Sequence, residues 1–379
     1  MNKNTVLIRN AQPFDFGGAE RFPVFLASEL SVHGLEPIII SRSTALTEFA
    51  NIHKQKTIKG WWWSQQNWNG LRALLSPIYI AWQVILYFYY LLLFIRIRPL
   101  NVHIQSKDDF IAATFAAKTL KKGVIWTDHA DLKHILKNLN IWYRNPVGKL
   151  VYIAAQFTDY ISVVSESEKR LVASRLNRRS KIIKKIHVIY NGAFDHYTPT
   201  KKNIKFTFIS TARLVGDKGI YELITAFKKL QIEYPSIQLQ LIGDGPERKH
   251  FESLAKNIDN IRFLGHQADP LTYLASAHIF VLPTYHEGFS LALVEACMEK
   301  LAIITTSVGG NPEIITHEKN GLLISKKSVD ELYNAMKQLY ENETLRKTLA
   351  ANARKAYLAD FNFKKIVEKD FLPLYRNGF

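Results

Sequence analysis

Short apolar runs alternate with amphipathic stretches along almost the whole chain. A short apolar run bounded by turn residues is typical of a buried strand, whereas apolar residues three and four positions apart are typical of a helix. In the first half, the runs that predict strands lie at 4–10, 36–41, 101–107, 123–129 and 159–164, helical stretches lie at 20–34, 108–122 and 166–176, and an apolar run at 186–190 closes the half.

The same alternation restarts at residue 204. Strands are predicted at 204–214, 237–246, 261–265, 277–283, 301–307 and 321–325, with helices between them such as 221–235 and 290–300. Strands that alternate with helices predict parallel sheets covered by helices, so the sequence predicts an α/β protein with two such domains. Parallel sheets bind ligands outside the carboxyl ends of their strands, and we expect the ligand in a central cleft that both sheets face.

The segment between the two halves has the composition of a linker. Residues 191–203, "NGAFDHYTPTKKN", are polar and contain glycine and proline. Such segments usually separate domains. We therefore assign residues 1–195 to the first domain and place the second domain after them.

The longest apolar stretch of the chain lies in the first domain. From Pro77 to Ile95 it runs nineteen residues without a charge, which is close to the length of a membrane-spanning helix. Aromatic and basic residues that favour the membrane interface flank it, namely Trp61, Trp62, Trp63, Trp68, Arg72, Arg96 and Arg98. A buried core helix and a membrane span are two alternatives. We expect a third arrangement, in which one face packs on the sheet and the other enters the lipid interface, because a span would remove a helix from between two strands of one sheet.

The charge of the chain is uneven and changes the picture. Residues 1–190 contain 26 Lys and Arg against 12 Asp and Glu, a net charge of +14, whereas residues 191–379 contain 24 against 21, a net charge of +3. A basic half predicts an anionic partner. No helix-turn-helix, zinc-finger or RNA-recognition pattern is present, so we expect an anionic membrane surface and no nucleic acid.

The single cysteine, Cys297, excludes an intrachain disulfide and suits a reducing compartment. The apolar run at the N-terminus is too short for a signal peptide. No His and Cys residues have the spacing of metal ligands. We therefore expect a cytoplasmic protein, associated peripherally with the inner face of the cell membrane and without a metal.

Two glutamates, Glu287 and Glu295, lie eight residues apart in the otherwise apolar stretch 285–300, where a strand, a loop and a helix are predicted in that order. A buried carboxylate needs hydrogen-bond donors, and the hydroxyl groups of a polyhydroxyl ligand can provide them. Backbone N–H groups at the start of the helix, near 289–291, suit a phosphate. A nucleotide-sugar would satisfy both requirements. The alternative is that both glutamates are ordinary solvated charges.

Several other polar residues follow predicted strands. Arg213 and Lys218 come after the first strand of the second domain, where two cations could neutralise a diphosphate. Gly17-Gly18 and Gly243 lie in turns that would allow close approach to a ligand, and His129 follows a strand of the first domain. Taken singly, the cations are compatible with solvated surface charges, the glycines with ordinary turns and His129 with a structural histidine.

In combination, these motifs resemble one family. Arg213 and Lys218, the sequence "GDGP" at 243–246, Glu287 and Glu295 in an E-x7-E spacing, and "GGNPEII" at 309–315 resemble the family 4 retaining glycosyltransferases of GT-B fold. In the first half, the residues 17–20, His129, "VVSESEK" and Asn191-Gly192 match the same family. Ser290 departs from the pattern because the family usually has glycine there, and residues 61–98 match no motif.

The resemblance implies a fold and a set of site residues. It implies two Rossmann-like domains with parallel sheets that face a central cleft, a second domain over 196–353 and a C-terminal helix over 354–379 that crosses back to the first domain. Glu287, Arg213, Lys218 and His129 would be catalytic, and the donor-binding residues would be Gly17, Gly18, Gly243, Leu264, Gly265, His266, Gly288, Phe289, Ser290, Leu291 and Glu295.

The implied reaction is transfer of a sugar from a nucleotide-diphosphate sugar, with retention of configuration, to a saccharide acceptor that we expect to be lipid-linked. The nucleotide-sugar is a co-substrate, and no cofactor or metal is expected. Glu295 would bind the ribose, Arg213 and Lys218 the diphosphate, and Glu287 the donor sugar. A GT-B enzyme with a soluble acceptor, a nucleotide-sugar 2-epimerase and a non-catalytic membrane-bound sugar-binding protein remain alternatives.

Overall fold

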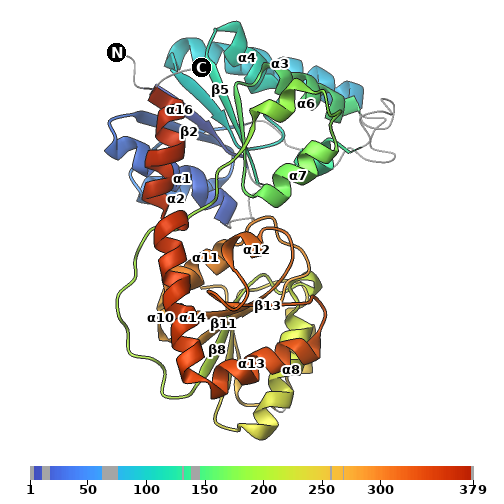
Figure 1. Cartoon of the computed structure of the whole chain (residues 1–379). Coiled ribbons are helices and arrows are strands. Elements are labelled where there is room, and N and C mark those ends of the chain that lie inside the picture. The colour runs from blue at the N-terminus through green and yellow to red at the C-terminus, as the bar shows by residue number, and fades with distance from the viewer. Residues whose placement is uncertain are drawn as a thin grey trace. The chain divides into compact units, whose positions relative to one another are not determined.

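The chain contains two compact units, each described here by itself (Figure 1). The computed structural model describes residues 4–10, 18–61, 76–129, 132–137, 146–256, 258–267 and 269–376. The first unit comprises Met1–Ile189 with Ile366–Phe379, and the second comprises Tyr190–Lys365. Both units are α/β structures built on a parallel sheet, as the alternation of strands and helices predicts.

The first unit contains a seven-stranded sheet in the order β3-β2-β1-β4-β5-β6-β7. Its strands are β1 (Asn4–Ile8), β2 (Glu36–Ser41), β3 (Lys56–Lys59), β4 (Asn101–Ile104), β5 (Gly123–Asp128), β6 (Tyr160–Val163) and β7 (Ile186–Val188). Every neighbouring pair is parallel. The chain order reverses between β1 and β4, and in open parallel sheets ligands bind outside the carboxyl ends of the strands at such a point.

Helices cover both faces of this sheet. They are α1 (Gly18–Val32), α2 (Thr44–Ile52), α3 (Ser76–Ile97), α4 (Ala112–Thr119), α5 (Leu132–Ile135), α6 (Pro146–Phe157), α7 (Glu166–Ser174), a short 3-10 helix η3 (Lys181–Lys185), the π-helical turn η6 (Val367–Phe371) and α16 (Leu372–Arg376). In Figure 1, α3, α4 and α6 lie on one face and α1, α2 and α16 on the other. The central strands are buried on both faces and are therefore continuously apolar.

The helix α3 has one buried and one exposed face. Tyr79, Gln83, Leu86, Tyr90 and Phe94 pack into the first unit, whereas Ile78, Val84, Ile85, Phe88, Leu92 and Ile95 are exposed; these six exposed residues are called the α3 face below. Among the described residues, α3 is the one helix whose length and composition would allow it to cross a membrane, with a mean hydropathy of 2.0 over a window of which 28% is buried. An exposed apolar stripe of this size on a packed helix is unusual in a soluble protein.

Two elements escape the sequence pattern, α2 and β3. The strand β3, "KTIK", has alternating charges and forms the edge of the sheet, where lysine is common because it discourages pairing with other chains. The helix α2 is nine residues long and begins at Ser43, whose Oγ accepts a hydrogen bond from the Leu46 amide. Short polar elements of this kind carry little hydrophobic signal.

The second unit contains a six-stranded parallel sheet in the order β10-β9-β8-β11-β12-β13. Its strands are β8 (Thr207–Thr211), β9 (Gln238–Ile242), β10 (Ile261–Gly265), β11 (Ile279–Leu282), β12 (Ala302–Thr306) and β13 (Leu322–Ile324). Its helices are η4 (Gly216–Lys218), α8 (Ile220–Glu233), α9 (Arg248–Leu254), α10 (Leu271–Ser276), α11 (Leu291–Met298), α12 (Asn311–Ile314), α13 (Val329–Glu341), α14 (Glu343–Ala356), η5 (Tyr357–Phe361) and α15 (Phe363–Ile366). The reversal of chain order lies between β8 and β11.

The observed boundaries differ from the expected positions at 195/196 and 353/354. Residues 190–195 belong to the second unit because Tyr190 stacks on Phe289 with ring centroids 5.3 Å apart. Arg354 also donates two hydrogen bonds to Asp195, at 2.9 and 2.7 Å. The final residues return to the first unit, where Asn101 Nδ2 donates to the backbone oxygen of the buried Tyr375 at 3.0 Å.

Candidate functional site

Glu287 lies in the loop between β11 and α11, at the carboxyl end of the second unit's sheet. Its Oε2 accepts a hydrogen bond from Lys218 Nζ at 2.7 Å, and the two side chains are 17% and 21% exposed. A half-buried carboxylate is stabilised by a paired cation. The structure therefore joins two of the expected catalytic residues directly, although 69 residues separate them in sequence.

The loop that carries Arg213 and Lys218 is fixed against the Glu287 loop. The Tyr285 amide donates to the Asp217 oxygen at 2.7 Å, and Thr284 Oγ1 donates to the same oxygen at 3.1 Å. Arg213 follows β8 and is exposed. Both cations thus stand at the carboxyl end of the sheet, and Arg213 is available to a ligand from solvent.

Gly309 explains the "GGNPEII" motif. Its φ of +53° lies in the region that favours glycine, and a Cβ there would be 1.6 Å from the Glu287 backbone oxygen. The Gly310 amide also donates to that oxygen at 3.3 Å. The motif therefore serves to seat the Glu287 loop against the loop after β12.

Gly243 lies after β9 and has a similar role between strands. Its φ is +128°, and a Cβ would be 1.9 Å from the Ala212 backbone oxygen. Its amide donates to the Gly265 oxygen at 2.8 Å. Gly243 thereby brings the Arg213 loop and the end of β10 close together.

The residues expected near the nucleotide base, Leu264, Gly265 and His266, form the end of β10 and the residue after it. Gln267 Nε2 donates to the Leu264 oxygen at 2.6 Å, and His266 is exposed. The neighbouring Asp244 has its pKa lowered by the hydrogen bond from the Gly245 amide and by the ion pair with Arg248. This edge therefore presents backbone groups next to a carboxylate that stays ionised.

The helix α11 begins where a phosphate site was expected. Ser290 is its N-cap, and its Oγ accepts a hydrogen bond from the Leu293 amide at 3.3 Å. Gly288 and Phe289 precede the helix, and Leu291 is its first residue. The first amides of a helix have no partner within it and lie at its positive end, so they can bind an anion. Ser290, which departs from the family's usual glycine, also supplies a capping side chain.

Glu295 lies about one turn inside α11 and is partly exposed. Its side chain is on the same helix as the expected phosphate site but belongs to neither the Lys218 pair nor the cap. The eight-residue spacing therefore separates two environments: Glu287 in a loop next to a cation, and Glu295 on a helix.

The first-unit residues lie at the end of its own sheet. His129 follows β5, is buried and has its ring 5.3 Å from that of Phe22. Burial, with smaller contributions from Arg9 and His103, lowers its pKa well below the usual value, so the imidazole is neutral. Gly18 is the first residue of α1, and Gly17 lies outside the described residues. The roles expected of these three residues toward a ligand stay predictions.

Arg9, Glu20 and Gln105 are polar residues that the sequence patterns did not single out. Arg9, which follows β1, donates to Glu20 Oε1 at 2.7 Å and to the Gln105 backbone oxygen at 2.5 Å. The Gln105 carboxamide is buried without a hydrogen-bond partner for either atom. These residues meet at the reversal point between β1 and β4. Their position just after predicted strands was a usable signal, but the strand order was needed to bring them together.

No group of three His, Cys, Asp or Glu residues suited to a metal ion occurs within the described part of the chain.

Comparison with known proteins places both halves of the chain. The family described as "Glycosyltransferase Family 4" matches residues 16–193, and the one described as "Glycosyl transferases group 1" matches residues 195–356. Together the two matches extend over nearly the whole chain.

Curated relatives agree with this assignment. The chain is 24% identical over 297 residues to the capsular polysaccharide biosynthesis glycosyltransferase CapM of Staphylococcus aureus, which covers 74% of this chain and 77% of that protein. It is 28% identical over 258 residues to a component of human phosphatidylinositol N-acetylglucosaminyltransferase, which covers 65% of this chain and 51% of the relative.

Solved structures agree on the fold. A glycosyltransferase from Rickettsia africae matches with a TM-score of 0.77 and 18% identity, covering 99% of this chain and 98% of that one. The Anabaena protein HepE, solved with UDP and glucose, matches with a TM-score of 0.75 and 18% identity, covering 98% and 99%. The chain belongs to the family 4 glycosyltransferases and has their GT-B fold, with two Rossmann-like units.

Proposed function

We propose that this glycosyltransferase takes its sugar from a nucleotide-diphosphate sugar bound at the carboxyl end of the second unit's sheet. The observation that carries the proposal is the direct pairing of Lys218 with Glu287 beside the start of α11. A cation, a carboxylate and helix-start amides are the groups that a diphosphate joined to a sugar requires. The Anabaena HepE structures with UDP and with UDP-glucose lend support from the same fold.

Each side chain has a proposed role. Arg213, Lys218 and the amides of 289–291 hold the diphosphate, Glu287 accepts hydrogen bonds from the donor sugar, and Glu295 accepts them from the ribose. The backbone at 264–266 contacts the base. In this arrangement Glu287 both binds the sugar and orients Lys218, because the two already form a hydrogen bond at 2.7 Å.

The reaction is proposed to retain the anomeric configuration. The growing negative charge on the leaving diphosphate is stabilised by preorganised cations and amides, which is usually a large contribution to catalysis. The leaving diphosphate then assists in deprotonating the attacking hydroxyl. Proton NMR of the product tests this step: a product anomer identical to that of the donor is expected, and the opposite anomer would overturn retention.

We further propose that the acceptor is a lipid-linked saccharide at the cytoplasmic face of a membrane. The α3 face and the +14 charge of residues 1–190 support this placement. Apolar side chains that enter the interface and cations close to anionic headgroups both favour binding, the latter by about 1 kcal/mol for each Lys or Arg near the surface. The human relative, by its name, acts on phosphatidylinositol.

The nucleotide base is to be identified by experiment. A thermal-shift screen with UDP, GDP and ADP is expected to raise the melting temperature with one of them, because a ligand that binds the native state stabilises it. The absence of a shift with all three at saturating concentration, in a protein that melts cooperatively, would contradict the proposed donor site.

A further inference from the structure

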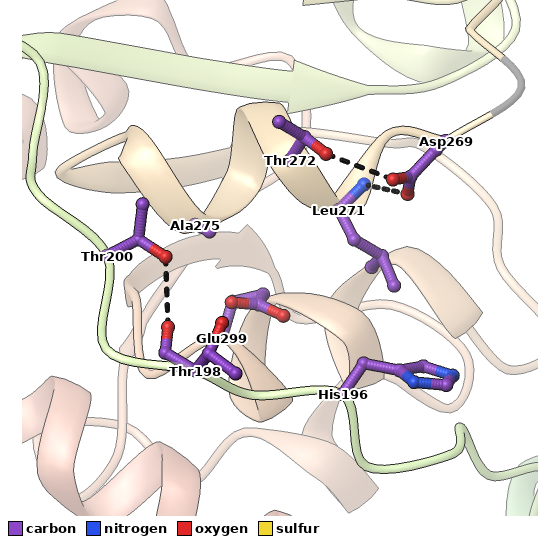
Figure 2. A pocket seen from close by; sticks show the side chains of 8 residues that line it. All are labelled: His196, Thr198, Thr200, Asp269, Leu271, Thr272, Ala275 and Glu299. Atoms are coloured by element: carbon purple, nitrogen blue, oxygen red, sulfur yellow. Dashed lines mark hydrogen bonds between the residues drawn. The ribbon is translucent and has the colours of Figure 1, made fainter.

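A separate cavity lies in the second unit, at the other end of α11 from Ser290. It has a volume of about 430 Å³ and is lined by His196, Thr198, Thr200, Asp269, Leu271, Thr272, Ala275 and Glu299 (Figure 2). The linker segment 196–200 forms one wall and α10 forms another. None of the residues assigned to the donor lines this cavity.

Glu299 forms the floor of the cavity. It is the C-cap residue of α11, is only 3% exposed, and its Oε2 is buried without a hydrogen-bond partner. Figure 2 shows its carboxylate in the middle of the lining residues, between α10 and the linker. Buried polar atoms are nearly always hydrogen-bonded, so an unpaired carboxylate oxygen at the floor of a cavity indicates a missing partner.

The neighbouring charges do not supply that partner. Burial raises the pKa of Glu299 to about 7, opposed by Lys202 and Arg354 and increased by Asp195 and Asp269. Both cations are engaged elsewhere: Lys202 Nζ donates to the Ala275 backbone oxygen at 3.0 Å, and Arg354 donates to Asp195 and to the Met298 backbone oxygen.

The walls of the cavity present hydrogen-bond acceptors. Thr272 Oγ1 donates its proton to Asp269 Oδ2 at 2.9 Å, and Thr200 Oγ1 donates to the Thr198 backbone oxygen at 2.9 Å, as the dashed lines in Figure 2 show. Each hydroxyl then has only lone pairs to offer a ligand. Together with two carboxylates, these groups select a ligand that donates hydrogen bonds and carries positive charge.

We propose that this cavity binds a small molecule with a protonated amine, whose ammonium group pairs with Glu299 and donates to the threonine hydroxyls. None of the eight lining residues is Phe, Tyr or Trp, so a neutral sugar ring has no such ring on which to stack. The ligand contacts the linker through Thr198 and Thr200. The proposal does not depend on the donor site.

The test uses ethanolamine as the amine and glycerol as a neutral polyol of similar size. Isothermal titration calorimetry is performed with the full-length wild-type protein, with Glu299→Gln and with the matched control Glu343→Gln, which changes an exposed glutamate outside the cavity. Ethanolamine is expected to bind the wild type and the control, and to bind Glu299→Gln about tenfold or more weakly. Equal binding by Glu299→Gln, equal binding of glycerol, or no binding to the wild type would overturn the proposal.

The pH dependence provides a second measurement. Binding is expected to be tighter at about pH 8 than at about pH 6, on either side of the Glu299 pKa of about 7, because the ionised carboxylate pairs with the amine. His196 also lines the cavity and histidines titrate in this range, so the comparison is repeated in His196→Gln, where the dependence is expected to persist. Its loss in that variant would assign the effect to His196 and overturn the role of Glu299. If Glu299→Gln fails to fold, Thr272→Val replaces it, with weaker binding expected and unchanged binding contradicting the proposal.

Discussion

At the scale of single residues, Lys218 and Glu287 form the centre of the proposed donor site. The sequence suggested a diphosphate role for Lys218 and a sugar role for Glu287, but it gave no sign that the two side chains meet. Their contact arises because β8 and β11 are neighbours in the sheet. The glycine-rich turns at 243 and 309 were visible in the sequence, yet their function, the close approach of two backbones, needed the strand order.

Removing either cation is expected to slow the reaction strongly. In Lys218→Ala or Arg213→Ala, the leaving diphosphate loses a preorganised positive charge, and the turnover number should fall about a hundredfold or more. The rate of sugar transfer is measured beside Lys249→Ala, which removes an exposed lysine of α9. A folded Lys218→Ala or Arg213→Ala variant that turns over at the control's rate would contradict the diphosphate assignment.

The two glutamates should affect different steps. Glu295→Gln is expected to weaken binding of the free nucleoside diphosphate by about tenfold, because the ribose hydroxyls lose a charged acceptor. Glu287→Gln should retain most nucleotide affinity and lose sugar transfer. Calorimetry with the nucleoside diphosphate separates the two; unchanged affinity in Glu295→Gln would show that the ribose role is wrong.

Glu299 is expected to make stability depend on pH. Its pKa in the folded protein, about 7, is above the ordinary value of 4.5, so the folded state holds the proton more tightly than the unfolded state does. The stabilisation is present below the ordinary pKa and is lost as pH rises through about 7. Urea unfolding should therefore show a smaller pH-dependent decrease over this range in Glu299→Gln than in the wild type; identical pH profiles would contradict the raised pKa.

At the scale of elements, most buried strands were predictable because a parallel sheet covered on both faces requires continuous apolar runs. The edge strand β3 and the helix α2 were not, since neither buries enough apolar surface to leave a pattern. The stretch that became α3 was recognised as apolar, but only its contacts divide it into a packed face and an exposed face.

The exposed side of α3 is expected to bind membranes. Replacing Phe88 and Leu92 together by glutamate should reduce co-sedimentation with anionic liposomes at least about tenfold, because two large apolar side chains no longer enter the interface. Both residues are more than half exposed, so the fold should persist; the control is Ile232→Glu, an apolar residue 83% exposed on the second unit. Wild-type recovery in the supernatant with every lipid mixture, at low and high salt, would contradict the membrane proposal.

The proposed absence of a metal requirement is also testable. If Arg213, Lys218 and the α11 amides neutralise the diphosphate, then transfer should continue at nearly the same rate after exhaustive treatment with EDTA. Loss of activity that Mg²⁺ or Mn²⁺ restores would show that a metal shares this role.

At the scale of the whole molecule, the repeated alternation of strands and helices was sufficient to predict two α/β units, and the motifs were sufficient to recognise the family. The unit boundaries were harder to place, because residues 190–195 are held by Phe289 and Arg354, which lie far along the chain. The acceptor is the least predictable part: it depends on residues 61–98, which match no motif, and residues 62–75 lie outside the described part of the structure.

The central claim is that the chain transfers a sugar from a nucleotide-diphosphate sugar to an acceptor. The most direct measurement is release of nucleoside diphosphate from the donor identified by thermal shift, with and without a lipid-linked saccharide, for the wild type and for Lys218→Ala. The account predicts release that depends on the acceptor, is accompanied by stoichiometric glycosylation of that acceptor, and falls about a hundredfold in Lys218→Ala. Release that is equally fast without acceptor and in Lys218→Ala, or donor binding with no transfer to any saccharide offered, would contradict it.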